Sequence, residues 1–231
     1  MTSNWSGNYT VGDTNFASVL LIQNSGMLLN GAVILGNTTG SSNNSVSITG
    51  LGSVCNNGAV DLHVGQNGPG NRLVISNGGL VVVGRNSFNG SYVGSNLSSS
   101  NNSVLVTDSG SVWSNSGTLS FGYASPGNSL VVSNGGRLVD STGYIYSGSG
   151  VTSNNVSVTG PARFGTIPVR WSLVRVRVVA TAWSSAMADW LSAPMAFCSV
   201  PATACWSAVR APCGAIVTIC TWARLVLGTA W

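Results

Sequence analysis

Short apolar runs separated by glycine- and asparagine-rich turns fill the first 160 residues of the chain. Runs of about three to five residues recur roughly every eight to twelve positions, as short β-strands joined by turns do. The clearest runs are Leu73–Ile75, Leu80–Val83, Val104–Val106, Leu119–Phe121, Leu130–Val132 and Tyr144–Tyr146. Because no window carries the 3.6-residue apolar stripe of an amphipathic helix, we predict an all-β structure.

Two of these segments return farther along the chain with almost the same sequence. The run GNRLVISNGG at Gly70–Gly79 returns as GNSLVVSNGG at Gly127–Gly136, and NNSVSITGLGSVC at Asn43–Cys55 returns as NNSVLVTDSGSVW at Asn101–Trp113. The spacings are 57 and 58 residues, so nearly three units of about 55 residues fill the first 160 positions. Each unit holds about six predicted strands, enough for two or three coils of a solenoid.

The repeat favours a parallel β-helix, or β-solenoid, over residues 1–161. In a solenoid each coil stacks on the next, so equivalent positions repeat chemically. We therefore expect Leu73 and Leu130 to stack inside, and Asn77 and Asn134 to align at a turn where their amides satisfy one another. A β-sandwich is the alternative, but its strands occupy different environments and give no reason to repeat a string.

The strings NNSVLVTDSGSVW, NSGTLSFG and GNSLVVSNGGRLV resemble the autotransporter and PEP-CTERM-associated repeat of bacterial surface proteins. The resemblance covers about residues 4–160 and implies a parallel β-helix in a secreted or surface-displayed passenger. It therefore implies an extracellular or outer-surface location, and it carries no catalytic residues to transfer. The sequence shows no signal peptide, barrel or sorting segment, and Met1 opens inside a repeat, so we expect a fragment or a misassigned reading frame.

The composition changes sharply after residue 161. Residues 1–161 hold all 23 Asn and 27 of the 30 Gly, whereas residues 162–231 hold four of the five Cys and six of the eight Trp. The formal charge of +4 divides into −1 before the boundary and +5 after it. The positive charge is therefore no footprint of a nucleic-acid partner on the repeat region, and we expect none.

The tail, residues 162–231, is predicted to be an out-of-frame copy of the repeat and not a true domain. If each codon is shifted by one base, Ala180–Ser192 allows GNSLVVSNGGLVV, whose first ten residues repeat the string Gly127–Gly136. The alternative is a real, unrelated C-terminal domain. The uncharged stretch Trp190–Val209 contains prolines and predicts no confident membrane span. The cysteines at 198, 205, 213 and 220 form no CxxC, so we expect no zinc site.

Composition also excludes most enzyme chemistry. The chain has no Lys and no Glu, which removes P-loop and Schiff-base mechanisms, and its five Asp are scattered. Scattered carboxylates supply neither an acid–base pair nor the oxygen cage that calcium requires. We therefore predict a protein that is not an enzyme, with no catalytic, cofactor-binding or metal-binding residues and no cofactor.

His63 and Asp61 are the one pair of residues that could take part in acid–base chemistry. They alternate within the predicted strand Ala59–Val64 and so share one face. An outward polar pair is the favoured interpretation, because no Ser, Cys or second acid is placed convincingly as a third member. Cys55 stands where the next unit has Trp113, so we expect a semi-buried apolar position and not a nucleophile.

Aromatic residues offer a possible contact surface for sugars, although aromatic side chains are equally natural in strands. The candidates are Trp5, Trp113, Tyr92, Tyr123, Tyr144 and Tyr146. The favoured function is a non-enzymatic, surface-displayed segment with an adhesive role, whose partners would be host or environmental surface glycans or proteins. The alternatives are a β-helix polysaccharide-active enzyme fragment or a carbohydrate-binding module. An ice-binding solenoid would need a Thr-x-Thr array, which the sequence lacks.

Overall fold

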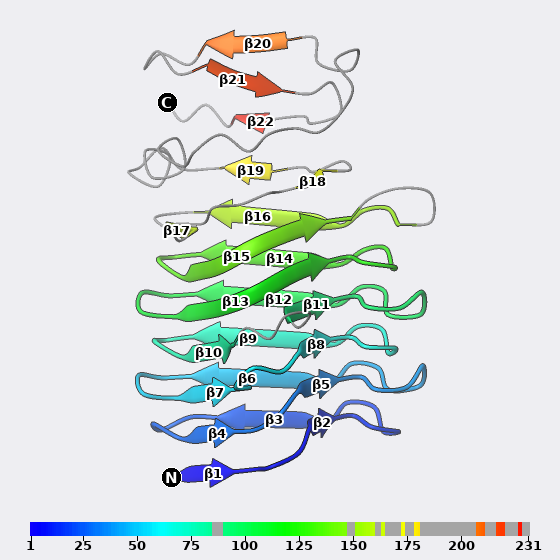
Figure 1. Cartoon of the computed structure of the whole chain (residues 1–231), viewed down its shortest axis with the longest axis vertical. Helices are drawn as coiled ribbons and strands as arrows, with labels where there is room; N and C mark the ends of the chain where they lie inside the picture. The colour runs from blue at the N-terminus through cyan, green and yellow to red at the C-terminus, as the bar shows by residue number, and fades with distance from the viewer. Residues whose placement is uncertain are drawn as a thin grey trace.

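The structure is a computed structural model that describes residues 1–84, 90–146 and 151–159, together with the backbone of short strands between 163 and 227. Every described element is a β-strand (Figure 1). The chain winds into a stack of coils, and the strands of each coil line three faces. No described helix is long and apolar enough to cross a membrane.

The first four coils each contain three separate strands. The first is β1 (Thr2–Asn4), β2 (Tyr9–Val11) and β3 (Val19–Ile22); the second is β4 (Met27–Leu29), β5 (Val33–Leu35) and β6 (Ser45–Thr49). The third is β7 (Val54–Asn56), β8 (Leu62–Val64) and β9 (Arg72–Ser76); the fourth is β10 (Leu80–Val83), β11 (Gly90–Val93) and β12 (Ser103–Thr107). These strands are short because a turn interrupts each apolar run.

In the fifth and sixth coils, one long strand spans the first two faces. These coils are β13 (Val112–Phe121) with β14 (Ser129–Ser133), and β15 (Arg137–Ile145) with β16 (Asn155–Thr159). The first face therefore holds β1, β4, β7 and β10, and the second holds β2, β5, β8 and β11, each continued by halves of β13 and β15. The third face holds β3, β6, β9, β12, β14 and β16.

All strand pairs within residues 1–159 are parallel, with one shift of register between Asn115 and Thr118 where β13 pairs with β15. This pairing confirms the predicted parallel β-solenoid and rejects the β-sandwich. Val54 pairs with Leu80, and Leu80 pairs with Val112. The repeat of about 58 residues seen in the sequence is thus two coils. The two coils within one repeat differ in sequence, whereas each coil resembles in sequence the coil two positions farther along the stack.

Parallel pairing continues into the tail. β17 (Arg163–Phe164) and β18 (Ser172–Leu173) pair with β15, β19 (Val178–Ala180) pairs with β16, and β22 (Val226–Leu227) pairs with β19. β20 (Ser207–Arg210) and β21 (Ile216–Ile219) pair antiparallel. The four tail cysteines and most of the stretch 190–209 lie outside the described residues. The boundary at 161 and the out-of-frame origin of the tail stay predictions.

The core is a set of apolar columns that run along the stack. Leu73 and Leu130 are both partners of Val104 in the coil between them, and all three side chains are buried. This arrangement confirms the prediction that the two leucines face inward. Alternate residues of the same strands point outward, so each strand contributes every second side chain to the interior.

A column of buried asparagines marks the corner before the third face. We call this column the asparagine ladder; its members are Asn44, Asn71, Asn102, Asn128 and Asn154. The backbone N–H of each member donates to the Oδ1 atom of the next, at 2.9, 2.7, 3.0 and 2.8 Å along the column. Each Nδ2 donates to a backbone carbonyl of a corner loop, so both ends of every amide are bonded.

The amide ladder is therefore not where the sequence placed it. Asn77 and Asn134 do occupy equivalent turns, with φ of 52° and 50°, but Asp108 holds the corresponding turn of the coil between them. Their Nδ2 atoms donate instead to the hydroxyls of Thr49 and Thr107 in the preceding coils. The structure thus contains a column of bonded asparagines, as predicted, but Asn77 and Asn134 are not its members.

Glycine is required opposite the asparagine ladder. Gly65 adopts a φ of +77°, and a Cβ atom there would overlap the amide of Asn102 in the next coil. Gly12, Gly36, Gly94 and Gly122 stand in the same relation to the other members of the ladder. A left-handed backbone and close contact both favour glycine at this corner.

Candidate functional site

The outward residues of the second face form one column along the stack. Successive partners in register are Thr10, Ile34, His63, Tyr92, Ser120 and Tyr144. On β8, Leu62 and Val64 point into the core and are buried, so His63 between them must point outward. The same alternation turns Tyr92 outward on β11. Strand periodicity thus brings the only histidine of the chain and two tyrosines onto one surface.

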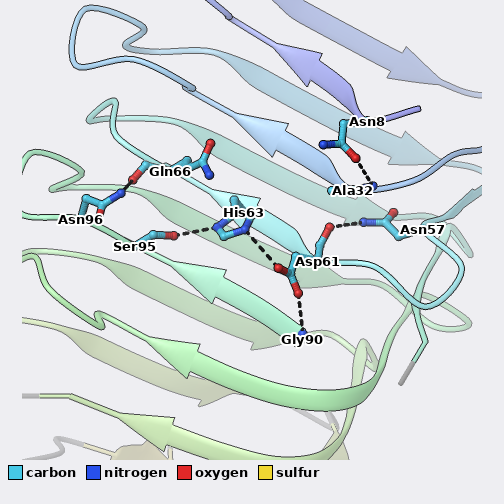
Figure 2. A network of polar contacts seen from close by, with 9 residues as sticks. All are labelled: Asn8, Ala32, Asn57, Asp61, His63, Gln66, Gly90, Ser95 and Asn96. Atoms are coloured by element: carbon cyan, nitrogen blue, oxygen red, sulfur yellow. Dashed lines mark hydrogen bonds and ion pairs between the residues drawn. The ribbon is translucent and has the colours of Figure 1, made fainter. Parts of the chain in front are cut away.

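His63 lies between a carboxylate and a hydroxyl group (Figure 2). Its Nε2 atom is 3.7 Å from Oδ2 of Asp61, and its Nδ1 atom is 2.9 Å from Oγ of Ser95. Asp61 precedes β8 in the same coil, whereas Ser95 follows β11 in the next coil. The imidazole therefore links two adjacent coils on the outer surface.

Asp61 is also held by the backbone of the next coil. Its Oδ1 atom accepts a hydrogen bond from the N–H of Gly90 at 2.9 Å. Partial burial opposes ionisation of this carboxyl, but the nearby His63 imidazole and the hydrogen bond from Gly90 outweigh it and lower the pKa of Asp61 below its ordinary value. Asp61 is therefore a carboxylate at neutral pH.

Five aromatic rings continue along the stack from this point. We call His63, Tyr92, Tyr123, Tyr144 and Tyr146 the aromatic strip. The ring of Tyr92 lies flat against that of His63, with centroids 4.9 Å apart and planes 7° apart. Tyr123 meets Tyr92 and Tyr146 edge-on, at 6.4 and 5.1 Å, and Tyr146 contacts Tyr144 at 6.1 Å. Successive coils thus carry one or two rings each, in unbroken contact.

The hydroxyls of Tyr92 and Tyr146 are neutral at physiological pH. Burial raises the pKa of Tyr92, and the nearby charge of Asp61 raises it further. Burial also raises the pKa of Tyr146, although a hydrogen bond with Ser120 opposes that effect. Protonated phenols both donate and accept hydrogen bonds, so the strip combines apolar ring surface with neutral polar groups.

The sequence predicted part of this site. The pairing of His63 with Asp61 is confirmed, and Ser95, which the sequence did not place beside them, bonds to the ring. Ser95 is 32 residues from His63 along the chain and reaches it only through the coil-to-coil register. Serine is abundant in the sequence, so no signal in the sequence distinguished this residue.

The six predicted aromatic residues divide into three groups. Tyr92, Tyr123, Tyr144 and Tyr146 gather on the aromatic strip. Trp113 is 0% exposed and belongs to the core, so it offers no surface to a ligand. Trp5 lies in the first coil, contacts Tyr9, and donates from Nε1 to the carbonyl of Asn8. Of the six predicted residues, four tyrosines therefore form one contact surface, whereas Trp5 is exposed apart from them in the first coil.

An acid, a histidine and a serine in contact invite comparison with a hydrolytic triad, in which the serine hydroxyl must reach a substrate. Ser95 is only 8% exposed, and the Nε2 to Asp61 distance of 3.7 Å exceeds a hydrogen bond. The arrangement therefore acts best as a polar link between coils. The described residues also contain no group of three His, Cys, Asp or Glu side chains placed to hold a metal ion.

Cys55 is more deeply buried than the sequence suggested. It is 2% exposed, not semi-buried, and it shares a core column with Val81 and Trp113. Burial raises the pKa of its thiol to about 12. A thiol that stays protonated at neutral pH is a poor nucleophile, which agrees with the prediction of a packing role.

No protein family, curated protein or solved structure matches this chain. The fold is therefore established by the structure alone, as a parallel β-solenoid. The likeness to surface-protein repeats rests on the quoted strings, and the function rests on the described residues.

Proposed function

We propose that this chain is a non-enzymatic structural segment, a β-solenoid rod that displays its outer faces from a secreted or surface-bound protein. The observation that carries the proposal is the asparagine ladder, whose members bond to one another through five coils. Repetition of one bonded unit builds length without a new fold at each step. Length and rigidity are what a stalk or spacer needs.

The outer surface of the third face supports the same function. Its outward positions carry mostly small hydroxyl residues beside a few aliphatic ones, such as Ser45, Ser47 and Thr49 on β6 and Ser103, Leu105 and Thr107 on β12. Hydroxyls of adjacent coils bond to each other, as Ser76 does to Thr49 at 3.1 Å. Side chains engaged with each other favour an inert, hydrated exterior over a concentrated reactive centre.

Location and partners follow from the resemblance to surface-protein repeats. We place the protein outside the cell or on its outer surface, where the exposed faces would meet glycans or proteins of a host or of the environment. Weak contacts repeated along a rod add up when several coils meet one surface. Adhesion is therefore the second part of the proposal.

Incubation of the full chain with a panel of polysaccharides separates this function from a polysaccharide-active enzyme. We expect no new reducing ends during prolonged incubation at any pH from 5 to 8. Release of reducing ends that is lost in both His63→Ala and Asp61→Asn would overturn the proposal and establish the enzymatic alternative. Leu105→Ser, on the third face, is the matched control because it lies away from His63.

The spacer role has its own test. The full chain is placed between a cell-surface anchor and an epitope tag, and antibody access to the tag is measured on whole cells. A second version lacks one two-coil unit, residues 54–111. If the segment is a spacer, access should fall when the unit is removed, whereas an unchanged signal contradicts that role.

A further inference from the structure

We infer that the aromatic strip binds a neutral polysaccharide whose chain runs along the axis of the solenoid. This inference rests on the proposed function and names the ligand class for its adhesive part. Four of the five tyrosines in the chain lie within this one strip. The outward positions of the third face hold mostly hydroxyl and aliphatic residues, with Arg72 and Asn155 but no aromatic ring, so the strip differs from that face in kind.

The direction of the strip sets the direction of the ligand. His63, Tyr92, Tyr123 and Tyr144 come from four successive coils, on or directly after β8, β11, β13 and β15. Strands in adjacent coils are spaced by about 4.8 Å. A pyranose unit of an extended glycan advances by a similar distance, so sugars in a row can each meet the rings of one coil.

The chemistry of the strip matches the two sides of a pyranose. Tyr123 is 51% exposed and stands nearly perpendicular to Tyr92 and Tyr146, which leaves apolar ring surface open to the C–H groups of a sugar. The phenol hydroxyls and the Asp61 carboxylate supply polar groups for sugar hydroxyls. Aromatic surface with a few placed polar groups is the usual make-up of a ligand site.

Charge selects a neutral glycan over an acidic one. Asp61 is ionised, as its lowered pKa requires. Two arginines of the described coils, Arg72 and Arg137, belong to β9 on the third face and β15 on the first. An anionic polymer would therefore approach a carboxylate, whereas a neutral polyol meets no such penalty.

Rigidity supports the same ligand. His63 is fixed between Asp61 and Ser95, and each tyrosine is braced by a neighbouring ring. Side chains already held in place lose little conformational entropy when a ligand binds. A surface of this kind suits a flexible polymer, which must supply most of the ordering itself.

The test is isothermal titration of the full chain with cellohexaose and mannohexaose, and with polygalacturonate as the acidic comparison. We expect at least one neutral hexasaccharide to bind, and polygalacturonate to bind at least tenfold more weakly. Tyr123→Ala should weaken binding about tenfold or more, because it removes the most exposed ring. Tyr123→Phe should keep most of the affinity, and Leu105→Ala on the third face should leave it unchanged.

Folding of each variant is checked by its circular dichroism melting curve, and saturation-transfer NMR shows which protons of the sugar contact the wild-type protein. Absence of binding to both neutral hexasaccharides would overturn the inference. Equal binding of polygalacturonate, or an equal loss of affinity in Tyr123→Ala and Leu105→Ala, would overturn it too. None of these results depends on the reducing-end assay or on the epitope-access measurement that test the proposed function. The inference can therefore fail while the proposed spacer stands.

Discussion

At the corner before the third face, asparagine occupies the same column in five successive coils, whereas the column between the first and second faces changes from Val83 to Asn115 to Asp140. We call the latter the mixed column. In the asparagine ladder, each Oδ1 accepts from the preceding coil and each Nδ2 donates to a corner loop. Because the same residue stands in every coil, each side-chain amide oxygen accepts the hydrogen bond that the backbone N–H of its neighbour must donate.

The mixed column leaves one polar atom without a partner. Asn115 accepts a hydrogen bond from Ser91 at 2.8 Å and donates to Oδ1 of Asp140 at 2.6 Å. Oδ2 of Asp140 is buried and has no hydrogen-bond partner. Burial raises the pKa of this carboxyl to about 7, against the hydrogen bonds from Asn115 and the backbone of Thr142 and Ser141. Where the repeat changes residue, burial of a polar group becomes costly.

Breaking the asparagine ladder at its centre should give the largest effect. In Asn102→Ala the buried N–H of Asn71 loses its acceptor and the interior loses a bonded amide. We expect the free energy of unfolding to fall by about 3 to 4 kcal/mol, as for a buried unsatisfied group plus lost packing. Urea denaturation measures the change. Asn96→Ala, at an exposed amide, is the matched control and should cost less than about 1 kcal/mol.

Adding a methyl group opposite the ladder should cost somewhat less. Gly65→Ala forces an alanine into a φ of +77° and pushes its Cβ atom into Asn102. We expect a loss of about 2 to 3 kcal/mol in the free energy of unfolding, from backbone strain and displacement of the amide. Gly40→Ala meets no atom within 4 Å and should be nearly neutral. Equal losses in the two variants would contradict this role for the glycine column.

The same contrast explains what the sequence could predict. The near-verbatim return of the string at Gly70 as the string at Gly127 was enough for the solenoid and for the inward leucines. It was not enough for the ladder, because its members stand 26 to 31 residues apart and the visible repeat spans two coils. A single coil shows only the pattern of an asparagine before an apolar run, which many turns share.

The site was harder to predict than the fold for a similar reason. Asp61 and His63 are two positions apart, so alternation along one strand placed them on one face. Ser95 and the stacked ring of Tyr92 come from the next coil, and their positions depend on a register that turn lengths determine. Tyr123 and Tyr146 follow the ends of strands, where alternation no longer assigns a face. Contacts between coils therefore needed the structure.

Asp140 offers a test of the mixed column through pH. Its pKa is raised from 3.8 to about 7 in the folded protein, so the folded state holds the proton more tightly than the unfolded chain. The contribution to stability is complete below about pH 4 and is lost as the pH rises to about 7. Asp61 acts in the opposite sense, because its lowered pKa makes stability fall as the pH drops below its ordinary value of 3.8.

Asp140→Asn should remove this pH dependence. The amide keeps an acceptor for Asn115 and cannot ionise, so the variant should be about 2 kcal/mol more stable than wild type at pH 8 and no more stable at pH 4.5. Urea denaturation at pH 4.5, 6 and 8 measures the difference. A variant less stable than wild type at pH 8 would mean that the carboxylate is well solvated or well bonded, and that the mixed column carries no penalty.

The smallest expected effect separates the outer link from the inner ladder. Ser95→Ala removes the hydrogen bond to Nδ1 of His63, but the imidazole is 14% exposed and keeps Asp61 and the ring of Tyr92 as neighbours. We expect a loss of about 1 kcal/mol in the free energy of unfolding, the usual net value of one hydrogen bond. The slope of the unfolding free energy against urea concentration should stay the same, because the surface exposed on unfolding hardly changes. A loss as large as that of Asn102→Ala would mean that bonds on the second face hold the coils together as strongly as the ladder does, and the distinction between the two regions would fail.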